Sequence, residues 1–262
     1  MTCIACGLEQ EHQLFDLVLP LEDEAFADRR IARCPSCDLA SARPMPTDEE
    51  LARFYTNLQH GVRSDRPLLR LPLRLWRAKR DADLLSLLQS VADLESLILD
   101  VGSGSGRLVR TARNAGYQRL VASDYSTVNV ELLAADGFDA RNGSIDDIGI
   151  EPGSLDVVWA SHVIEHMRDP LAFLASVRRL LAPEGRLVVL LPSSTSLRAR
   201  TKTSTWHHVN PPGHLWGFNP ANWRRLLERE GFAVERLANS RLVCELVAVA
   251  HPVCSGDDVV DR

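Results

Sequence analysis

The segment that most restricts the fold of this chain is "ILDVGSGSGRLV", residues 98–109. An apolar run ends in Asp100, glycines follow at alternate positions, and the spacing of apolar residues then becomes helical. A strand, a glycine turn and a helix in this order place backbone N–H groups and a helix N-terminus around a ligand, which can approach the glycines closely. The segment therefore predicts a ligand-binding turn between a strand and a helix.

From residue 97 onward, short apolar segments alternate with segments of helical spacing. Strands are expected near 97–101, 119–123, 138–141, 155–160 and 186–191, and helices near 105–115, 127–136, 170–181 and 219–230. The segments "GFAVERLA" and "RLVCELVAVA" predict two closing strands. This alternation is typical of a mainly parallel sheet with helices on both faces. We therefore predict an α/β, doubly wound, Rossmann-like domain with a mainly parallel seven-stranded sheet over residues 97–252.

The details of the turn narrow the class of ligand. A nicotinamide-type fingerprint, G-x-G-x-x-G/A, needs a small residue where this chain has Arg107, and the small residue is Gly106 instead. The next strand ends in "LVASDYS", which places Asp124 about 20 residues after the turn, where an acid can accept both hydroxyl groups of a ribose. A nucleoside ligand is the prediction. The alternative is that the acid only caps a helix, a role that Ser126 or Thr127 could share.

Several motifs in order resemble the class I S-adenosylmethionine-dependent methyltransferases: "LDVGSGSG", "SDYS", "NGSIDDI", "LDVVWASHVIEHMRDP" and "LLAPEGRLVVLLPS". The resemblance covers about residues 80–250. It implies that Asp100 and the turn 102–106 hold the methionine part of the cofactor S-adenosylmethionine, Asp124 the ribose, and the "GSIDDI" loop the adenine. The implied cofactor-binding residues are Asp100, Gly102, Gly104, Gly106, Asp124, Tyr125, Ser144, Ile145 and Ser161.

The adenine loop departs from the family pattern. Members of the family usually have an acid directly after the glycine of this loop, where the chain has Ser144, with Asp146 and Asp147 following. Ile145 could be only a packing residue. The contacts to the adenine are therefore less well defined by the sequence than those to the ribose.

The segment "SHVIEHMRDP" follows the fourth expected strand and carries His162, Glu165 and His166. If the segment is helical, the spacing i, i+3, i+4 puts all three side chains on one face. Methyl transfer from a sulfonium mainly requires alignment of the nucleophile and removal of its proton. A neutral histidine is a suitable base near pH 7, so His162 and His166 are candidate catalytic residues.

Two alternatives remain for the same segment. Two imidazoles and a carboxylate on one face could hold a divalent metal. Some quinone-pathway methyltransferases that this stretch resembles have an acid where His162 stands, with an equivalent Glu-His pair. Otherwise Glu165 and His166 only brace the segment while "MRDP" ends it.

A second group of histidines and tryptophans lies in "TWHHVNPPGHLWGFNPANW". Related small-molecule methyltransferases resemble it in a "P-x-H-L-x-x-F" phrase, which Pro212, His214, Leu215 and Phe218 match. The resemblance implies that this loop forms the wall of the acceptor pocket, with His214 as a third candidate catalytic residue. The alternative is a rigid surface loop that covers the sheet edge.

Four cysteines form two C-x2-C pairs, Cys3/Cys6 and Cys34/Cys37. This spacing is typical of a four-thiolate zinc site, which is structural because all four ligands come from the protein. A redox function fits less well, since neither pair lies between a strand and a helix. We predict a zinc-ribbon domain over residues 1–46.

Residues 47–96 are expected to form a helical linker or lid. In "TDEELARFY", Thr47 can cap a helix and Glu50 can complete a capping box. The Arg/Leu-rich arm 62–80 follows, which could be a lid helix, a surface for a phosphate-bearing or lipid-like acceptor, or a solvated connection. Pro67 and Pro72 are expected to interrupt a long helix in this arm.

The chain carries 30 basic and 35 acidic residues, a formal net charge of −5, so no global attraction to nucleic acid is expected. No apolar stretch approaches the ~20 residues of a membrane span, and no signal peptide follows Met1, so a cytoplasmic protein is expected. The sequence predicts a methyltransferase for a small-molecule acceptor, by resemblance a sugar or natural-product intermediate. The alternatives are an RNA base methyltransferase and a non-catalytic cofactor-binding partner subunit. The sequence does not predict an oligomeric state.

Overall fold

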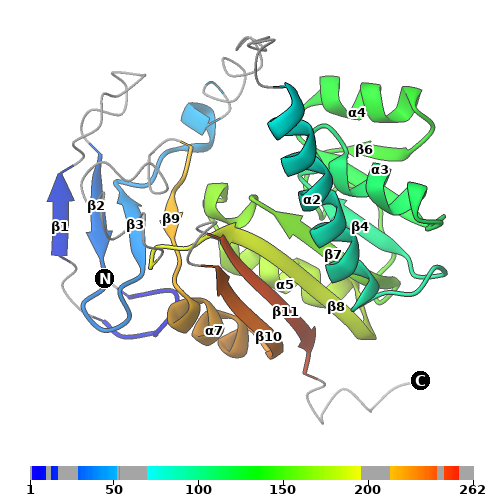
Figure 1. Ribbon diagram of the computed structural model, residues 1–262. Helices are drawn as coiled ribbons and strands as arrows, with labels where there is room; N and C mark the ends of the chain where they lie inside the picture. Colours follow the sequence, from blue (N-terminus) through cyan, green and yellow to red (C-terminus); the bar gives the residue numbers. More distant parts are fainter. Residues whose placement is uncertain are drawn as a thin grey trace.

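The computed structural model contains two sheets, and helices pack around the larger one (Figure 1). The residues that the structure describes are 2–9, 13–16, 29–51, 53, 70–195, 213–240 and 245–253. Within these ranges, no helix combines the length and the apolar character needed to cross a membrane.

The larger sheet has seven strands in the order β10-β11-β8-β7-β4-β5-β6. These strands are β4 (Ile98–Val101), β5 (Leu120–Asp124), β6 (Asp139–Asn142), β7 (Leu155–Ser161), β8 (Leu181–Pro192), β10 (Phe232–Ser240) and β11 (Glu245–Pro252). Strands β6, β5, β4, β7 and β8 are parallel, whereas β11 pairs antiparallel with β8 and β10. The predicted mainly parallel seven-stranded sheet is confirmed.

Helices cover both faces of this sheet, which confirms the doubly wound arrangement. The helices are α2 (Arg70–Gln89), α3 (Arg107–Asn114), α4 (Thr127–Ala135), α5 (Pro170–Leu180) and α7 (Pro220–Arg229). Buried side chains of α2 and α3 belong to one core cluster, and those of α5 and α7 belong to a second. Neighbouring residues Ile98 and Leu99 on β4 divide between the two clusters, because successive side chains of a strand point to opposite faces.

The order of the strands reverses beside β4, which lies between β5 and β7. In doubly wound sheets, ligands bind at such a switch point, outside the carboxyl ends of the strands. The glycine turn follows β4 directly, and the segment with His162 follows β7. Both predicted site segments therefore lie at the edge where this fold binds ligands.

The smaller sheet joins the N-terminal region to the C-terminal half of the chain. Its strands, in the order of the sheet, are β1 (Gln13–Asp16), β2 (Arg30–Arg33), β3 (Ala40–Arg43) and β9 (Trp216–Gly217). All three pairings are antiparallel. The region predicted as a zinc ribbon therefore takes its fourth strand from a distant segment, and its buried cysteines share a core cluster with α5 and α7.

Between the two sheets, the predicted helix start at Thr47 is confirmed, whereas the predicted helix break at Pro72 is wrong. Residues 48–51 and 53 are helical, and Thr47 and Glu50 exchange the two bonds of a capping box, 3.2 and 2.6 Å long. Pro72 was expected to interrupt a helix, but it lies in the first turn of α2, where a missing N–H costs no helical hydrogen bond. Pro67 and the arm before Arg70 lie outside the described residues.

Candidate functional site

The three glycines of the turn all have positive φ angles, 63° at Gly102, 52° at Gly104 and 73° at Gly106. A Cβ atom at Gly102 would lie 2.6 Å from Cγ2 of Val163, and one at Gly106 would overlap the side chain of Leu133. A Cβ atom at Gly104 would meet nothing within 4 Å. Two of the glycines are therefore required by packing, whereas the middle one leaves open space through which a ligand can reach the backbone.

Asp124 braces this turn from the end of β5. Its Oδ2 atom accepts a hydrogen bond from the Gly104 N–H at 2.7 Å, and its Oδ1 atom accepts one from the Ser126 N–H at 2.8 Å. Ser126, and not the acid, caps α4 by accepting from the Asn129 N–H. The capping alternative thus applies to Ser126, and Asp124 lies at the carboxyl edge of the sheet next to the open position.

Asp100 is buried at the end of β4, with 4% of its surface exposed. Burial, together with the nearby negative charge of Asp124, raises the pKa of Asp100 to about 8. At pH 7 the Asp100 carboxyl group is therefore mostly protonated in the absence of a ligand. A positively charged ligand beside Asp100 would favour the ionised form.

The remaining predicted cofactor residues lie in different environments. Tyr125 is 76% exposed, whereas Ile145 is 6% exposed and packs in the core cluster that contains α5 and α7. Ser144 donates a hydrogen bond from its hydroxyl to Asp147 at 2.6 Å, and half-buried Ser161 ends β7. Tyr125 is thus available to a ligand, and the packing alternative stated for Ile145 agrees with its burial.

Asn142 is a residue at this edge that sequence reasoning missed. Its side-chain amide donates to the backbone carbonyls of Asp124 and Tyr125, at 3.0 and 3.1 Å. These bonds fix the loop that follows β5. No motif marks this role, because an asparagine at a strand end is common.

The α-helix on which a shared face in "SHVIEHMRDP" depends is not present. Only Ile164–His166 form a single turn of 3-10 helix, η3, and His162 precedes it with a φ angle of 56°. The three side chains therefore do not share the face of an α-helix, because one tight turn takes its place. The turn nevertheless brings the three predicted groups together: Nδ1 of His162 lies 3.2 Å from Oε1 of Glu165, and Nε2 of His166 lies 3.9 Å from the same oxygen.

His162 is held between two carboxylates. Its Nε2 atom lies 3.0 Å from Oε1 of Glu245 on β11, which also accepts from Arg80 of α2 at 2.8 Å. Burial alone would lower the pKa of His162, but the hydrogen bonds to Glu165 and Glu245 raise it to about 9. With both ring nitrogens bound to carboxylates and a positive charge at pH 7, His162 is poorly suited to accept a proton.

Glu165 is 1% exposed, and its Oε2 atom is buried without a hydrogen-bond partner among the described residues. Burial tends to raise the pKa of this carboxyl. The hydrogen bond from His162 and the nearby charges of His166, His162 and His214 outweigh that tendency and hold the pKa below its usual value. Glu165 is therefore a buried carboxylate at the centre of the predicted catalytic histidines.

The predicted acceptor loop, where it is described, lies against this cluster. The ring of His166 and the ring of His214 are 4.6 Å apart between centroids at an interplanar angle of 73°, and Nδ1 of His166 donates to the backbone carbonyl of Gly213. Leu215 and Phe218, which matched the family phrase, are fully buried. Pro212 and the preceding His207, His208 and Trp206 lie outside the described residues.

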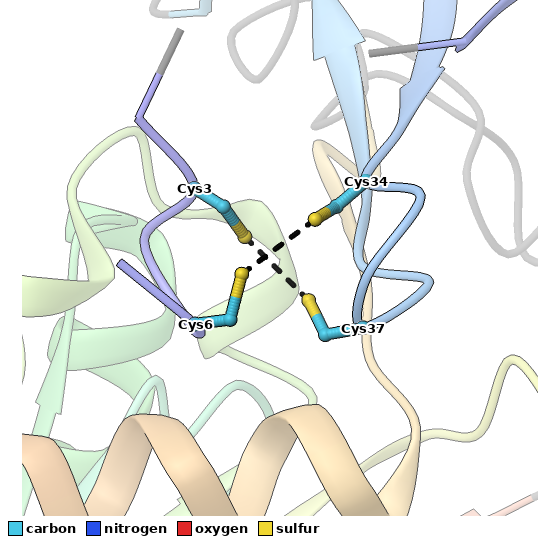
Figure 2. A group of neighbouring side chains, drawn as sticks. All are labelled: Cys3, Cys6, Cys34 and Cys37. Carbon is cyan, nitrogen blue, oxygen red and sulfur yellow. Dashed lines mark hydrogen bonds between the residues drawn. The ribbon is translucent and has the colours of Figure 1, made fainter. Parts of the chain in front are cut away.

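The four cysteines converge although the two pairs are far apart in the sequence (Figure 2). The Sγ atoms of Cys3 and Cys37 are 3.5 Å apart, and those of Cys6 and Cys34 are 3.7 Å apart. Zn–S bonds of about 2.3 Å in a tetrahedron require sulfur atoms roughly 3.8 Å apart. The four sulfurs therefore fit a single zinc ion.

The second cysteine turn is attached to the C-terminal half of the chain through two asparagines. The side chains of Asn219 and Asn222 both donate to the backbone carbonyl of Cys37, at 3.1 and 3.2 Å. Both asparagines are buried, and they also form the capping box of α7. Sequence reasoning missed this contact because it joins residues more than 180 positions apart.

Comparison with known proteins gives one family and several relatives. The model of the family described as "Methyltransferase domain" matches residues 70–237. A "Probable S-adenosylmethionine-dependent methyltransferase" of Mycolicibacterium smegmatis is 29% identical over 140 residues, which are 53% of this chain and 52% of that protein. A "Ubiquinone biosynthesis O-methyltransferase" of Cereibacter sphaeroides is 32% identical over 97 residues, 35% of this chain and 39% of that protein.

A "tRNA U34 carboxymethyltransferase" of Dichelobacter nodosus is 35% identical over 99 residues, 35% of this chain and 31% of that protein. The matched segments thus span about half or less of these relatives. Among solved structures, magnesium protoporphyrin IX methyltransferase of Synechocystis with bound SAH has the same fold, with a TM-score of 0.56 and 17% identity, over 78% of this chain and 95% of that one. The family model spans more than half of the sequence, and the chain therefore belongs to the methyltransferase domain family.

Proposed function

We propose that this chain transfers a methyl group from S-adenosylmethionine to a small-molecule acceptor, such as a sugar or natural-product intermediate. One observation carries the proposal: Val163, which lies between His162 and Ile164, packs where a side chain at Gly102 would be. The glycine turn and the cluster of histidines are therefore direct neighbours at the ligand-binding edge of the sheet. Membership in the methyltransferase domain family supports the reaction class.

The residues around the turn fit the cofactor. The open space beside Gly104 admits a ligand to the backbone, and the carboxyl groups of Asp100 and Asp124 suit a molecule with a sulfonium and an amino group. We assign Asp100 to the methionine part and Asp124 to the ribose, whose hydroxyls would share Oδ2 with the Gly104 N–H. The exposed ring of Tyr125 is available to the adenine. When bound, the cofactor supplies the methyl group.

The acceptor is assigned to the side of His166 and His214. Because the carbonyl of Gly213 can only accept a hydrogen bond, Nδ1 of His166 carries a proton, and Nε2 is the atom that can act on an acceptor. His162, held by Glu165 and Glu245, is a positioning residue that fixes the Glu165 carboxylate. Proton removal thus falls to His166 or His214, either directly or through a bound ion.

The role of the four-cysteine cluster is structural in this proposal. We assign one zinc ion to Cys3, Cys6, Cys34 and Cys37, since the sulfur separations suit a tetrahedral site. The cluster attaches to the catalytic half through Asn219 and Asn222, and β3 pairs with β9 beside the acceptor loop. Zinc would therefore hold the wall of the acceptor site in place.

The proposal is tested by measuring S-adenosylhomocysteine formed from S-adenosylmethionine in the presence of pools of small hydroxylated and amino compounds. We expect product that depends on the pool and falls at least about 100-fold in His214→Gln, since a general base contributes roughly 10²–10⁴-fold. Tight cofactor binding without turnover on any pool would instead support a non-catalytic partner subunit.

The relative that modifies tRNA favours a second candidate, methylation of an RNA base. Phosphate contacts would make such binding strongly dependent on salt. Titration of mixed tRNA at low and high ionic strength separates the two candidates. Affinity that falls steeply with salt would support RNA, and absence of binding at low salt would eliminate it.

A further inference from the structure

Outside the four cysteines, the described residues contain one other group with the composition of a metal site. Glu165 and His166 come from η3, and His214 comes from the loop before β9. One potential ligand atom from each lies within 4.8 Å of the other two. Two imidazoles and a carboxylate are a ligand set that binds divalent transition metals.

The first indication of a missing ligand is the carboxylate of Glu165. Its side chain is 1% exposed, and its Oε2 atom has neither solvent nor a hydrogen-bond partner in the described part of the chain. A buried polar atom without a partner is unfavourable, and more so when it is charged. A bound cation would remove this cost.

The orientation of His166 is the second sign. Nδ1 donates to the Gly213 carbonyl, so the ring presents Nε2 toward Oε1 of Glu165, 3.9 Å away. This separation is too long for a hydrogen bond, but it is within the roughly 4.2 Å that two atoms each about 2.1 Å from one ion can span, and a shift of about 0.5 Å would bring the two atoms to the separation of a tetrahedral site. Metal-binding histidines typically donate their other N–H to a backbone carbonyl or a carboxylate.

The surroundings of Glu165 complete the pattern. Oε1 also contacts Nδ1 of His162 at 3.2 Å, and His162 is held in turn by Glu245. Carboxylates that bind metals are usually hydrogen-bonded by neighbouring groups in this way. The His162 ring therefore orients the Glu165 carboxylate through Oε1 and leaves Oε2 available to an ion.

We propose that Glu165, His166 and His214 bind one divalent transition-metal ion, such as Mn²⁺, Co²⁺ or Zn²⁺, at a site separate from the four cysteines. Three protein ligands leave coordination positions open, which water or an oxygen atom of an acceptor can fill. Only the role toward an acceptor rests on the proposed function. The binding of the ion itself depends only on these three side chains.

The test is a Mn²⁺ titration of the full-length protein, with the cysteine cluster loaded with zinc, followed by electron paramagnetic resonance of the unbound ion. Mn²⁺ prefers oxygen and nitrogen ligands to thiolates, so the cysteines do not contribute. We expect one saturable Mn²⁺ per chain. His214→Gln and Glu165→Gln should each weaken binding by about 100-fold or more, since even neighbouring hydrogen-bond partners of ligands account for roughly 10–100-fold.

The matched control is His251→Gln, which also removes an imidazole beside a glutamate, since Nδ1 of His251 lies 2.9 Å from Glu235. This variant should bind Mn²⁺ like the unmodified protein. If Glu165→Gln does not fold, as judged by circular dichroism, the half-buried His214 still provides the test. Absence of saturable binding, or binding that His214→Gln leaves unchanged, would overturn the proposal.

Calorimetry of S-adenosylmethionine binding on the same samples separates this inference from the proposed function. Retained cofactor binding without Mn²⁺ binding would defeat only the metal site. Mn²⁺ binding without cofactor binding would defeat the proposed function and leave the metal site standing.

Discussion

The backbone N–H of Leu215 donates to the backbone carbonyl of Glu165 at 2.7 Å, while the Leu215 carbonyl accepts from the N–H of Ala42 at 2.8 Å. One residue of the loop before β9 thus joins the histidine cluster on one side to β3 of the smaller sheet on the other. The cysteine cluster, the loop before β9 and the turn after β7 form a continuous hydrogen-bonded structure. A structural change in one of these segments should therefore alter the conformation of the others.

If the cysteine cluster holds zinc as proposed, its loss is expected to disturb the loop before β9. Metal analysis of the purified chain should return one zinc per chain at the cysteine cluster, besides any ion bound by Glu165, His166 and His214. Cys37→Ser should lose that one zinc and lower the free energy of unfolding by several kcal/mol. His214 should then become more accessible to diethyl pyrocarbonate, because the loop loses its support from β3. An iron signal, or a zinc-free protein of undiminished stability, would contradict this role.

The glycine turn provides a matched pair of substitutions. Gly104→Ala adds a methyl group to open space, so it should weaken S-adenosylmethionine binding at least about 10-fold while destabilising the protein only by the roughly 1–2 kcal/mol of a left-handed alanine. Gly106→Ala overlaps Leu133 and should mainly lower stability. Calorimetry and thermal unfolding of both variants check this. Equal binding by Gly104→Ala and the unmodified chain would show that the ligand does not approach there.

The raised pKa of Asp100 predicts a pH dependence of cofactor binding. In the ligand-free protein this pKa is about 8, because the carboxyl is buried near Asp124. A cationic ligand favours the ionised form, so binding should release a proton near pH 7, and affinity should rise from pH 6 to pH 8. Calorimetry in buffers of different ionisation enthalpy measures the proton. In Asp100→Asn the release should disappear; a release that persists there would point to another group.

His162 predicts a decline of stability in alkali. Its pKa is raised to about 9 by Glu165 and Glu245, above the value of about 6.5 expected in the unfolded chain. The contribution of this charge is complete below pH 6.5 and is lost as the pH rises through 9. The melting temperature should therefore fall between pH 7 and pH 9.5. His162→Gln should already be less stable at pH 7, and its melting temperature should depend much less on pH. A parallel fall of the melting temperature in both proteins would show that another group causes it.

The sheet and the glycine turn could be predicted because their signals are local. Apolar runs such as the one before Asp100 show a buried strand, and the glycines after it mark a turn, without reference to any distant residue. The cysteine cluster could also be predicted, since each C-x2-C pair is a local unit. These elements depend on neighbours within a few positions.

The rest depends on contacts between distant segments. Arg80, His162 and Glu245 form one charged chain, but 83 residues separate the histidine from the glutamate. The two-residue strand β9 has too short a sequence to show that it pairs with β3. The helical spacing in "SHVIEH" was misleading, because a single turn of 3-10 helix after a strand can gather the same side chains.

The central claim is that the turn after β4 binds S-adenosylmethionine, and calorimetric titration tests it most directly. The unmodified chain should bind S-adenosylmethionine and S-adenosylhomocysteine at micromolar concentrations and should not bind NAD. Asp124→Ala should weaken both sulfur ligands at least about 10-fold, a loss of ~1.4 kcal/mol. Preference for NAD, no binding of either sulfur ligand, or unchanged affinity in Asp124→Ala would contradict the account.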